Sequence, residues 1–150
     1  MYMGTIGVLS AARRPANIFA ITGSRFHGKI RDKRIITPIT YQIGEYINEI
    51  ALALIDTGST ESVICLADAR RVTGTEPCDT GMIRWLSGQS ENVLYYESVL
   101  TFPGGLKLST DLIDVYEGKS DLADIIIGMD IISKGTLTID GKNGTFTFEV

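Results

Sequence analysis

The sequence is poor in the residues that support metal, disulfide and nucleic-acid chemistry. Its 150 residues include one histidine, two cysteines, four prolines and one tryptophan. Cys65 and Cys78 are too few for a disulfide framework and have no metal-ligand spacing with His27, so we expect reduced thiols, no metal and no cofactor. The net charge of -4 argues against nucleic acid as the main partner, because phosphate binding needs clustered positive charge.

Long apolar runs are also missing. No stretch approaches the roughly 20 apolar residues that a transmembrane helix requires, so we expect no membrane partner. The short apolar patch within residues 1–12 is followed by arginines instead of being preceded by them, which is the reverse of a signal peptide. The expected compartment is therefore the cytoplasm.

Apolar residues are nevertheless plentiful, at 44% of the chain, which is enough to bury one core. Short β-branched stretches separated by turn residues predict many strands and little helix. Strands are expected at 36–43, 46–55, 62–65, 82–96 (as a hairpin), 99–102, 106–108, 112–116, 136–139 and 145–150, and short helices at 67–72 and 129–133. This pattern predicts an all-β, barrel-like domain.

The most informative stretch is an apolar run that ends in an acid. Residues 51–55 are all apolar and lead directly into Asp56, which is followed by Thr57, Gly58 and Ser59. Such a run is typical of a strand buried on both faces, and an ionised aspartate is rarely left inside a protein without a partner. The sequence therefore predicts a core strand that delivers a carboxyl group to a tight turn. An ordinary turn at a strand end is the alternative.

A second apolar run, residues 123–132, contains Ile-Ile-Gly-Met-Asp at 126–130. Together with Leu-Ile-Asp-Thr-Gly-Ser at 54–59, it resembles the retropepsins, the retroviral-type single-domain aspartic proteases and their bacterial and retrotransposon relatives. The resemblance covers roughly residues 35–150, which would form the protease domain. It implies a closed β-barrel with a flap hairpin and one or two short helices, forming half of a homodimeric aspartic protease.

The resemblance also assigns roles to residues. Asp56 would be the catalytic aspartate, and Thr57 would brace the two loops across the dimer axis. Gly58 would bring its N–H near the carboxylate, and Ser59 would donate to the outer carboxylate oxygen. The pair Ile127 and Gly128 would pack beside this loop in a ψ-shaped arrangement.

Peptide hydrolysis by carboxylates needs one ionised and one protonated group, which two adjacent carboxyls provide by sharing a proton. The chain has one such motif, at Asp56, so the active unit is expected to be a homodimer with Asp56 from each subunit on a two-fold axis. The substrate would be a polypeptide. The residues expected at the flap and in substrate binding are Trp85, Leu86, Ser87 and Gly88.

A second Asp-Thr-Gly occurs at Asp79. Two-lobed aspartic proteases carry two such triplets, but each lobe needs on the order of 100 residues, and Asp79 follows Asp56 far too closely. No apolar strand leads into Asp79 either. We therefore predict that this triplet forms a turn.

The N-terminal extension, residues 1–34, is compatible with an arm, a propeptide or an added strand. Within it, residues 23–29 match the start of a phosphate-binding loop and follow a strand-like segment. That motif requires Ser or Thr next and then a helix, whereas Ile30 follows and Pro38 lies in the β-branched stretch beyond. The motif is therefore a weak indication of nucleotide binding.

Three functional hypotheses follow. The first is an aspartic endopeptidase active as a homodimer. The second is a catalytically silent peptide-binding or assembly module on the same fold, since a fold alone does not establish a function. The third is nucleotide binding through residues 23–29.

Overall fold

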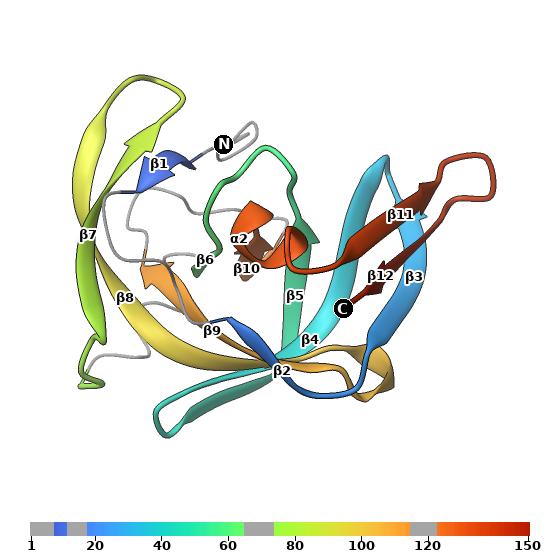
Figure 1. Ribbon diagram of the computed structural model, residues 1–150, viewed down its shortest axis with the longest axis horizontal. Coiled ribbons are helices and arrows are strands. Elements are labelled where there is room, and N and C mark those ends of the chain that lie inside the picture. The colour runs from blue at the N-terminus through green and yellow to red at the C-terminus, as the bar shows by residue number, and fades with distance from the viewer. Residues whose placement is uncertain (1–7, 12–17, 65–73, 115–122) are drawn as a thin grey trace.

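The structure is a computed structural model that describes residues 8–11, 18–64, 74–114 and 123–150. In these residues the chain is almost entirely β-structure, which confirms the all-β prediction (Figure 1). The helix predicted at 67–72 lies outside the described residues. No helix in the described part is long and apolar enough to cross a membrane.

The described residues form twelve strands and two short helical segments. In chain order these are β1 (Val8–Ala11), β2 (Phe19–Thr22), β3 (Arg25–Arg31), β4 (Arg34–Ile43), β5 (Tyr46–Ile55), β6 (Val63–Ile64), β7 (Asp79–Trp85), β8 (Ser90–Thr101), the 3-10 turn η2 (Pro103–Gly105), β9 (Lys107–Asp114), β10 (Ile125–Ile127), α2 (Met129–Ile132), β11 (Thr136–Asp140) and β12 (Thr145–Glu149).

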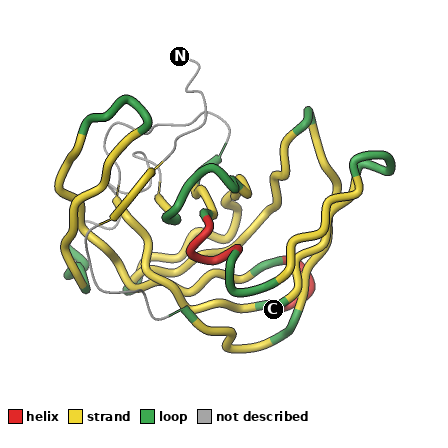
Figure 2. The backbone as a smooth tube through the Cα atoms, turned by 45° about the horizontal axis from the view of Figure 1, so that its top comes forward, coloured by secondary structure: helices red, strands yellow, loops and turns green. Residues whose placement is uncertain are grey.

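The strands follow the order β1-β7-β8-β9-β6-β10-β5-β4-β3-β12-β11, with β2 paired to β9. A further antiparallel pairing joins β4 to β8, so the path from β8 through β9, β6, β10 and β5 to β4 returns to its start. Figures 1 and 2 show the sheet curving around the short helix α2. Because β10 belongs to this path, the segment after it is held near the end of β5.

The β4–β5 hairpin matches its prediction at residues 36–43 and 46–55, but the burial of β5 does not. Ala51, Ala53 and Ile55 face the core, whereas Ile50 is 90% and Leu52 43% exposed. The prediction of a strand buried on both faces, made for residues 51–55, was therefore wrong at Leu52. Side chains alternate across a strand, and only one face of this part of β5 is covered.

The described parts of residues 1–34 form strands of the same sheet. β1 pairs with β7, β2 with β9, and β3 with both β12 and β4. Phe26 of β3 is 2% exposed and stacks on Phe102 at 4.4 Å between ring centroids. The phosphate-loop hypothesis is wrong, because β3 continues into β4 and no helix follows it.

Two other predictions need correction. Asp79 begins β7 and pairs with Tyr95, so the second Asp-Thr-Gly lies in a strand and does not form a turn. The strands expected at 106–108 and 112–116 are one continuous strand over Lys107–Asp114, and residues 115–116 lie outside the described part. The hairpins over 82–96 and 136–150 and the short helix after Gly128 are confirmed.

The core has two parts. The larger cluster contains the aromatic group around Phe26 and the inward side chains of β4 and β5. The smaller cluster, which we call the flap-side cluster, consists of Val63, Ile83, Val93, Tyr95, Ile113 and Ile126. Its members come from β6, β7, β8, β9 and β10, so it joins the β7–β8 hairpin to the strands beside Asp56.

Candidate active site

Asp56 lies at the end of β5, where three strands meet. β10 lies between β5 and β6, parallel to the first and antiparallel to the second. Ile127 pairs with Ile55, and the Asp56 N–H donates to the Ile127 carbonyl at 2.9 Å. Two strands that follow each other in the chain with a third inserted between them form a ψ-shaped arrangement, visible at the centre of Figure 1.

The two oxygens of the Asp56 carboxyl differ in their surroundings. The residue is 9% exposed, and its Oδ1 accepts a hydrogen bond from the Gly58 N–H at 2.8 Å. Its Oδ2 is buried and has no hydrogen-bond partner among the described residues. Burial raises the pKa of the carboxyl above its ordinary value, and the Gly58 N–H partly opposes this shift. One oxygen is thus held by a hydrogen bond, and the other has no hydrogen bond within the described residues.

The three residues after Asp56 differ in their exposure to solvent. Thr57 and Gly58 are exposed, whereas Ser59 is fully buried. The Ser59 hydroxyl donates to the Glu61 carbonyl at 2.7 Å, so the expected hydrogen bond from Ser59 to the outer oxygen of Asp56 is wrong. The hydroxyl closes the turn instead, because a buried Oγ needs a partner and the Glu61 carbonyl provides one.

Gly128 lies directly against the loop that follows Asp56. A Cβ at this position would lie 2.4 Å from the Glu61 carbonyl oxygen and 2.8 Å from that of Ser59. The next residue continues the contact, since the Met129 N–H donates to the Ser59 carbonyl at 2.7 Å. Any side chain at Gly128 would push this segment away from the turn that carries Asp56.

Two further residues, which the sequence analysis missed, hold this contact together. The Ser62 hydroxyl accepts from the Gly128 N–H at 2.9 Å and donates to Asp130 Oδ1 at 2.7 Å. The Ser62 N–H donates to Asp130 Oδ2 at 3.0 Å. Asp130 stands in the first turn of α2, where acids are favoured, and that was the available signal. Ser62 gave no distinct signal in the sequence.

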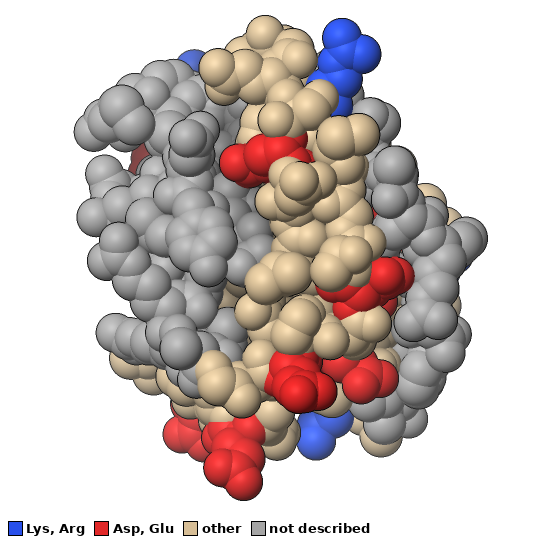
Figure 3. All heavy atoms as spheres, turned by 90° about the vertical axis from the view of Figure 1, so that its left-hand side faces the viewer, with Lys and Arg blue, Asp and Glu red and all other residues tan. Residues whose placement is uncertain are grey.

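The expected flap residues form the tip of the β7–β8 hairpin. The Gly88 N–H donates to the Trp85 carbonyl at 2.9 Å, and Gly88 has φ +86°, which favours glycine. Leu86 is 60% exposed and Ser87 is exposed at this tip. Among the charged side chains seen on the described part of this side of the molecule, acidic ones are more frequent than basic ones (Figure 3).

Trp85 connects the hairpin to the candidate site. It is partly buried and packs against the flap-side cluster, as does Leu54, which lies two residues before Asp56. Its indole N–H donates to Glu91 Oε1 at 3.0 Å across the hairpin. The structure thus links Trp85 to the strand that carries Asp56 through shared apolar packing, whereas Leu86 and Ser87 lie at the exposed tip.

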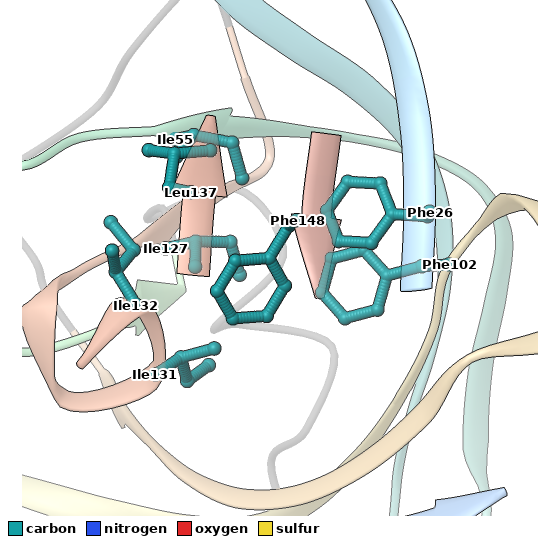
Figure 4. A pocket seen from close by; sticks show the side chains of 8 residues that line it. All are labelled: Phe26, Ile55, Phe102, Ile127, Ile131, Ile132, Leu137 and Phe148. Atoms are coloured by element: carbon teal, nitrogen blue, oxygen red, sulfur yellow. The ribbon is translucent and has the colours of Figure 1, made fainter. Parts of the chain in front are cut away.

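An apolar cavity of about 10 Å³ lies on the core side of the site (Figure 4). Its walls are Phe26, Ile55, Phe102, Ile127, Ile131, Ile132, Leu137 and Phe148. Ile55 and Ile127, which flank the Asp56 turn, form its border toward the site. Since its lining is entirely apolar and its volume is smaller than that of a bound ligand, it belongs to the core.

No group of His, Cys, Asp and Glu in the described residues is arranged to hold a metal ion. Comparisons of the sequence with protein-family models and with curated proteins found no match.

Proposed function

We propose that the chain is a retropepsin-like aspartic endopeptidase that acts as a homodimer, each subunit a closed β-barrel contributing Asp56. The observation that carries this proposal is the state of the Asp56 carboxyl. It is buried at the ψ-shaped junction, its Oδ1 is held by Gly58, and its Oδ2 has no partner among the described residues. A second carboxyl is the partner that would give this oxygen a chemical role.

In the proposed dimer, Asp56 and the partner's copy share one proton, because two carboxylates about 3 Å apart cannot both be ionised. The ionised group takes a proton from a water molecule, which then attacks the peptide carbonyl. The protonated group supplies its proton to the carbonyl oxygen as the tetrahedral intermediate forms. The burial that raises the pKa of Asp56 favours the singly protonated pair. The pair titrates as a unit.

The requirement for a second subunit follows from the position of the two triplets. Asp79 is located in β7 and does not meet the Asp56 turn in the described sheet pairings. Thr57 and Gly58 are exposed directly beside the buried carboxyl, so they are accessible to a second copy. A two-fold axis through this point brings identical turns together and supplies the second carboxyl.

The proposed substrate is an extended polypeptide with apolar side chains near the cleaved bond. Leu54, two residues before Asp56, and Trp85 of the hairpin are both partly buried and pack against the flap-side cluster. An apolar side chain that enters between the hairpin and the Asp56 turn would meet the apolar surfaces of these two residues. Burial of such a side chain favours binding by about 25 cal/mol per Å² of apolar surface.

The test is cleavage of a diverse peptide mixture by the wild-type protein and by Asp56→Asn, analysed by mass spectrometry from about pH 4 to 8. The proposal predicts products in the wild type that are absent in the variant. The cleavage sites would give the side-chain preference directly. Peptide binding without products, by a folded dimer, would contradict the proposal and favour a catalytically silent peptide-binding module.

A further inference from the structure

The outer edge of the β7–β8 hairpin is already paired with a strand from the N-terminal part of the chain. β1 runs antiparallel to β7, with Val8 opposite Trp85, Ser10 opposite Arg84 and Ala11 opposite Ile83. The other edge of β7 is occupied by β8, and β1 is the last strand on this side of the sheet. β1 therefore covers the only edge of β7 that a further strand can join.

This edge faces the candidate active site. In both Figure 1 and Figure 2, β1 lies on the side of the hairpin directed toward the loop of residues 56–62, which follows β5. The paired residues of β7 include Trp85, which packs against the same cluster as Leu54. A peptide that runs between the hairpin and Asp56 in an extended conformation would follow this edge.

The pairing of β1 has the features of a displaceable contact. β1 has four residues, and its register is interrupted between Val8 and Ser10. Among the strongly contacting pairs of described elements, β7 is its single partner. An edge strand this short contributes few main-chain hydrogen bonds, and each of them is exchanged for a similar bond when another strand replaces it.

We propose that the outer edge of β7 is the acceptor for the substrate's main chain, and that β1 occupies it within the same chain and competes with substrate. This inference rests on the proposed function, since it specifies how that site takes its substrate and how access is limited. The ligand class is an extended peptide that adds a strand to a sheet edge. The occupying segment, Val-Leu-Ser-Ala, consists of aliphatic and small residues.

The competition has a measurable consequence. When the open state is a fraction of the population, the apparent dissociation constant for a substrate rises by the inverse of that fraction. Weakening β1 therefore lowers KM for peptide cleavage and leaves kcat unchanged. A purely structural role of β1 predicts the opposite, because loosening the hairpin would reduce kcat or raise KM.

The experiment compares Ser10→Pro with Ser10→Ala in the full chain. Proline removes a main-chain N–H and disfavours pairing in the middle of β1, whereas alanine keeps the N–H and serves as the matched control. The Trp85 N–H is already bonded to the Gln89 carbonyl within the hairpin, and neighbouring N–H groups point to opposite edges of a strand. The proposal therefore predicts faster hydrogen exchange at the Arg84 amide in Ser10→Pro only. It also predicts a KM several-fold lower than that of the wild type or Ser10→Ala, at equal kcat.

A synthetic peptide of residues 5–14, with a scrambled peptide as control, provides a second measurement. The proposal predicts that the first peptide inhibits Ser10→Pro competitively and restores protection at the Arg84 amide. Faster exchange with an unchanged or higher KM would overturn it, as would unchanged exchange in Ser10→Pro.

Failure of the proposed function can be distinguished from failure of this inference. If no variant cleaves peptides, the exchange measurement still decides. Protection of the Arg84 amide by the peptide in Ser10→Pro would support the acceptor edge, and absence of protection would overturn it.

Discussion

The chain contains Asp-Thr-Gly twice, and the two copies have different surroundings. Asp56 ends a core strand, is 9% exposed, and accepts a hydrogen bond from Gly58, two residues ahead. Asp79 begins β7, and its Oδ1 accepts from the N–H of the adjacent Thr80 at 2.8 Å. The same three residues thus form a tight turn in one place and the first part of a strand in the other.

The difference lies outside the triplet. β5 leads into Asp56, and β10 runs beside β5. The Ile127 carbonyl of β10 accepts a hydrogen bond from the Asp56 N–H. Asp79 is preceded by a loop and pairs with Tyr95 of β8. The triplet at Asp56 is a candidate site because it follows a core strand and packs against a second loop, whereas the triplet at Asp79 follows a loop and begins a strand. Four experiments test whether this distinction is functional as well as structural.

The largest difference is expected between Asp56→Asn and Asp79→Asn. Removing the general acid–base group should lower kcat/KM by about a thousandfold or more, in line with the usual contribution of such groups. Asp79→Asn keeps an acceptor for the Thr80 N–H, so its activity should stay within about twofold of wild type. Peptide cleavage measured side by side decides, and equal losses in both variants would contradict the assignment.

Gly128→Ala should cause the largest loss of stability. The added Cβ would lie 2.4 Å from the Glu61 carbonyl oxygen, so the backbone has to move, at a cost of about 3 kcal/mol or more. Gly141→Ala is the control, since nothing lies within 4 Å of a Cβ there. Urea unfolding of both variants measures the difference. A fully stable Gly128→Ala would contradict the close approach of the two loops.

Ser62→Ala should reduce both stability and activity, whereas Ser98→Ala should reduce only stability. Both hydroxyls are buried, but Ser62 binds Gly128 and Asp130, while Ser98 donates to the Thr110 carbonyl. Loss of a buried partner costs about 1–3 kcal/mol. Unfolding and kcat are measured for each variant. If Ser98→Ala loses as much kcat as Ser62→Ala, the Ser62 network has no special role in placing Asp56.

The smallest effect is a pH dependence of stability. Burial raises the pKa of Asp56 in the folded state, so the folded protein holds this proton more tightly than the unfolded chain. Ionisation then costs stability as pH rises from the ordinary value of 3.8 through the raised one, and costs none below that window. The Tm of Asp56→Asn should therefore rise relative to wild type across this interval. A relative fall, measured by thermal scans, would contradict the shift.

The sequence was sufficient to predict the fold class, the β4–β5 and β11–β12 hairpins and the short helix after Gly128. These elements have local signals, namely β-branched runs separated by turn residues. The sequence was not sufficient to predict which side chains of β5 are buried or at which residues β9 begins and ends. Burial depends on which face of a strand is covered, and strand length depends on the neighbouring strand, so both are set by contacts distant in sequence.

The candidate site was likewise predictable from the sequence only where its residues carry a local signal. Asp56 was predicted because it follows an apolar run, and Gly128 because its motif, together with that of Asp56, resembles the retropepsins. The hydrogen bonds of Ser62 and Asp130 were not, since they join residues 68 positions apart. Ser59 was assigned the wrong acceptor because the conformation of the turn, and not its composition, places the Glu61 carbonyl next to its hydroxyl. Polar networks between loops are fixed by the tertiary fold.

The central claim is that two copies of Asp56 form one active site, and mixing subunits tests it most directly. Wild-type and Asp56→Asn subunits are combined in equal amounts, exchanged to equilibrium, and assayed at constant total concentration. If both aspartates are needed, random pairing leaves about one quarter of the activity of an all-wild-type sample. If each subunit acts alone, about one half remains. One quarter supports the shared site, and one half would contradict it.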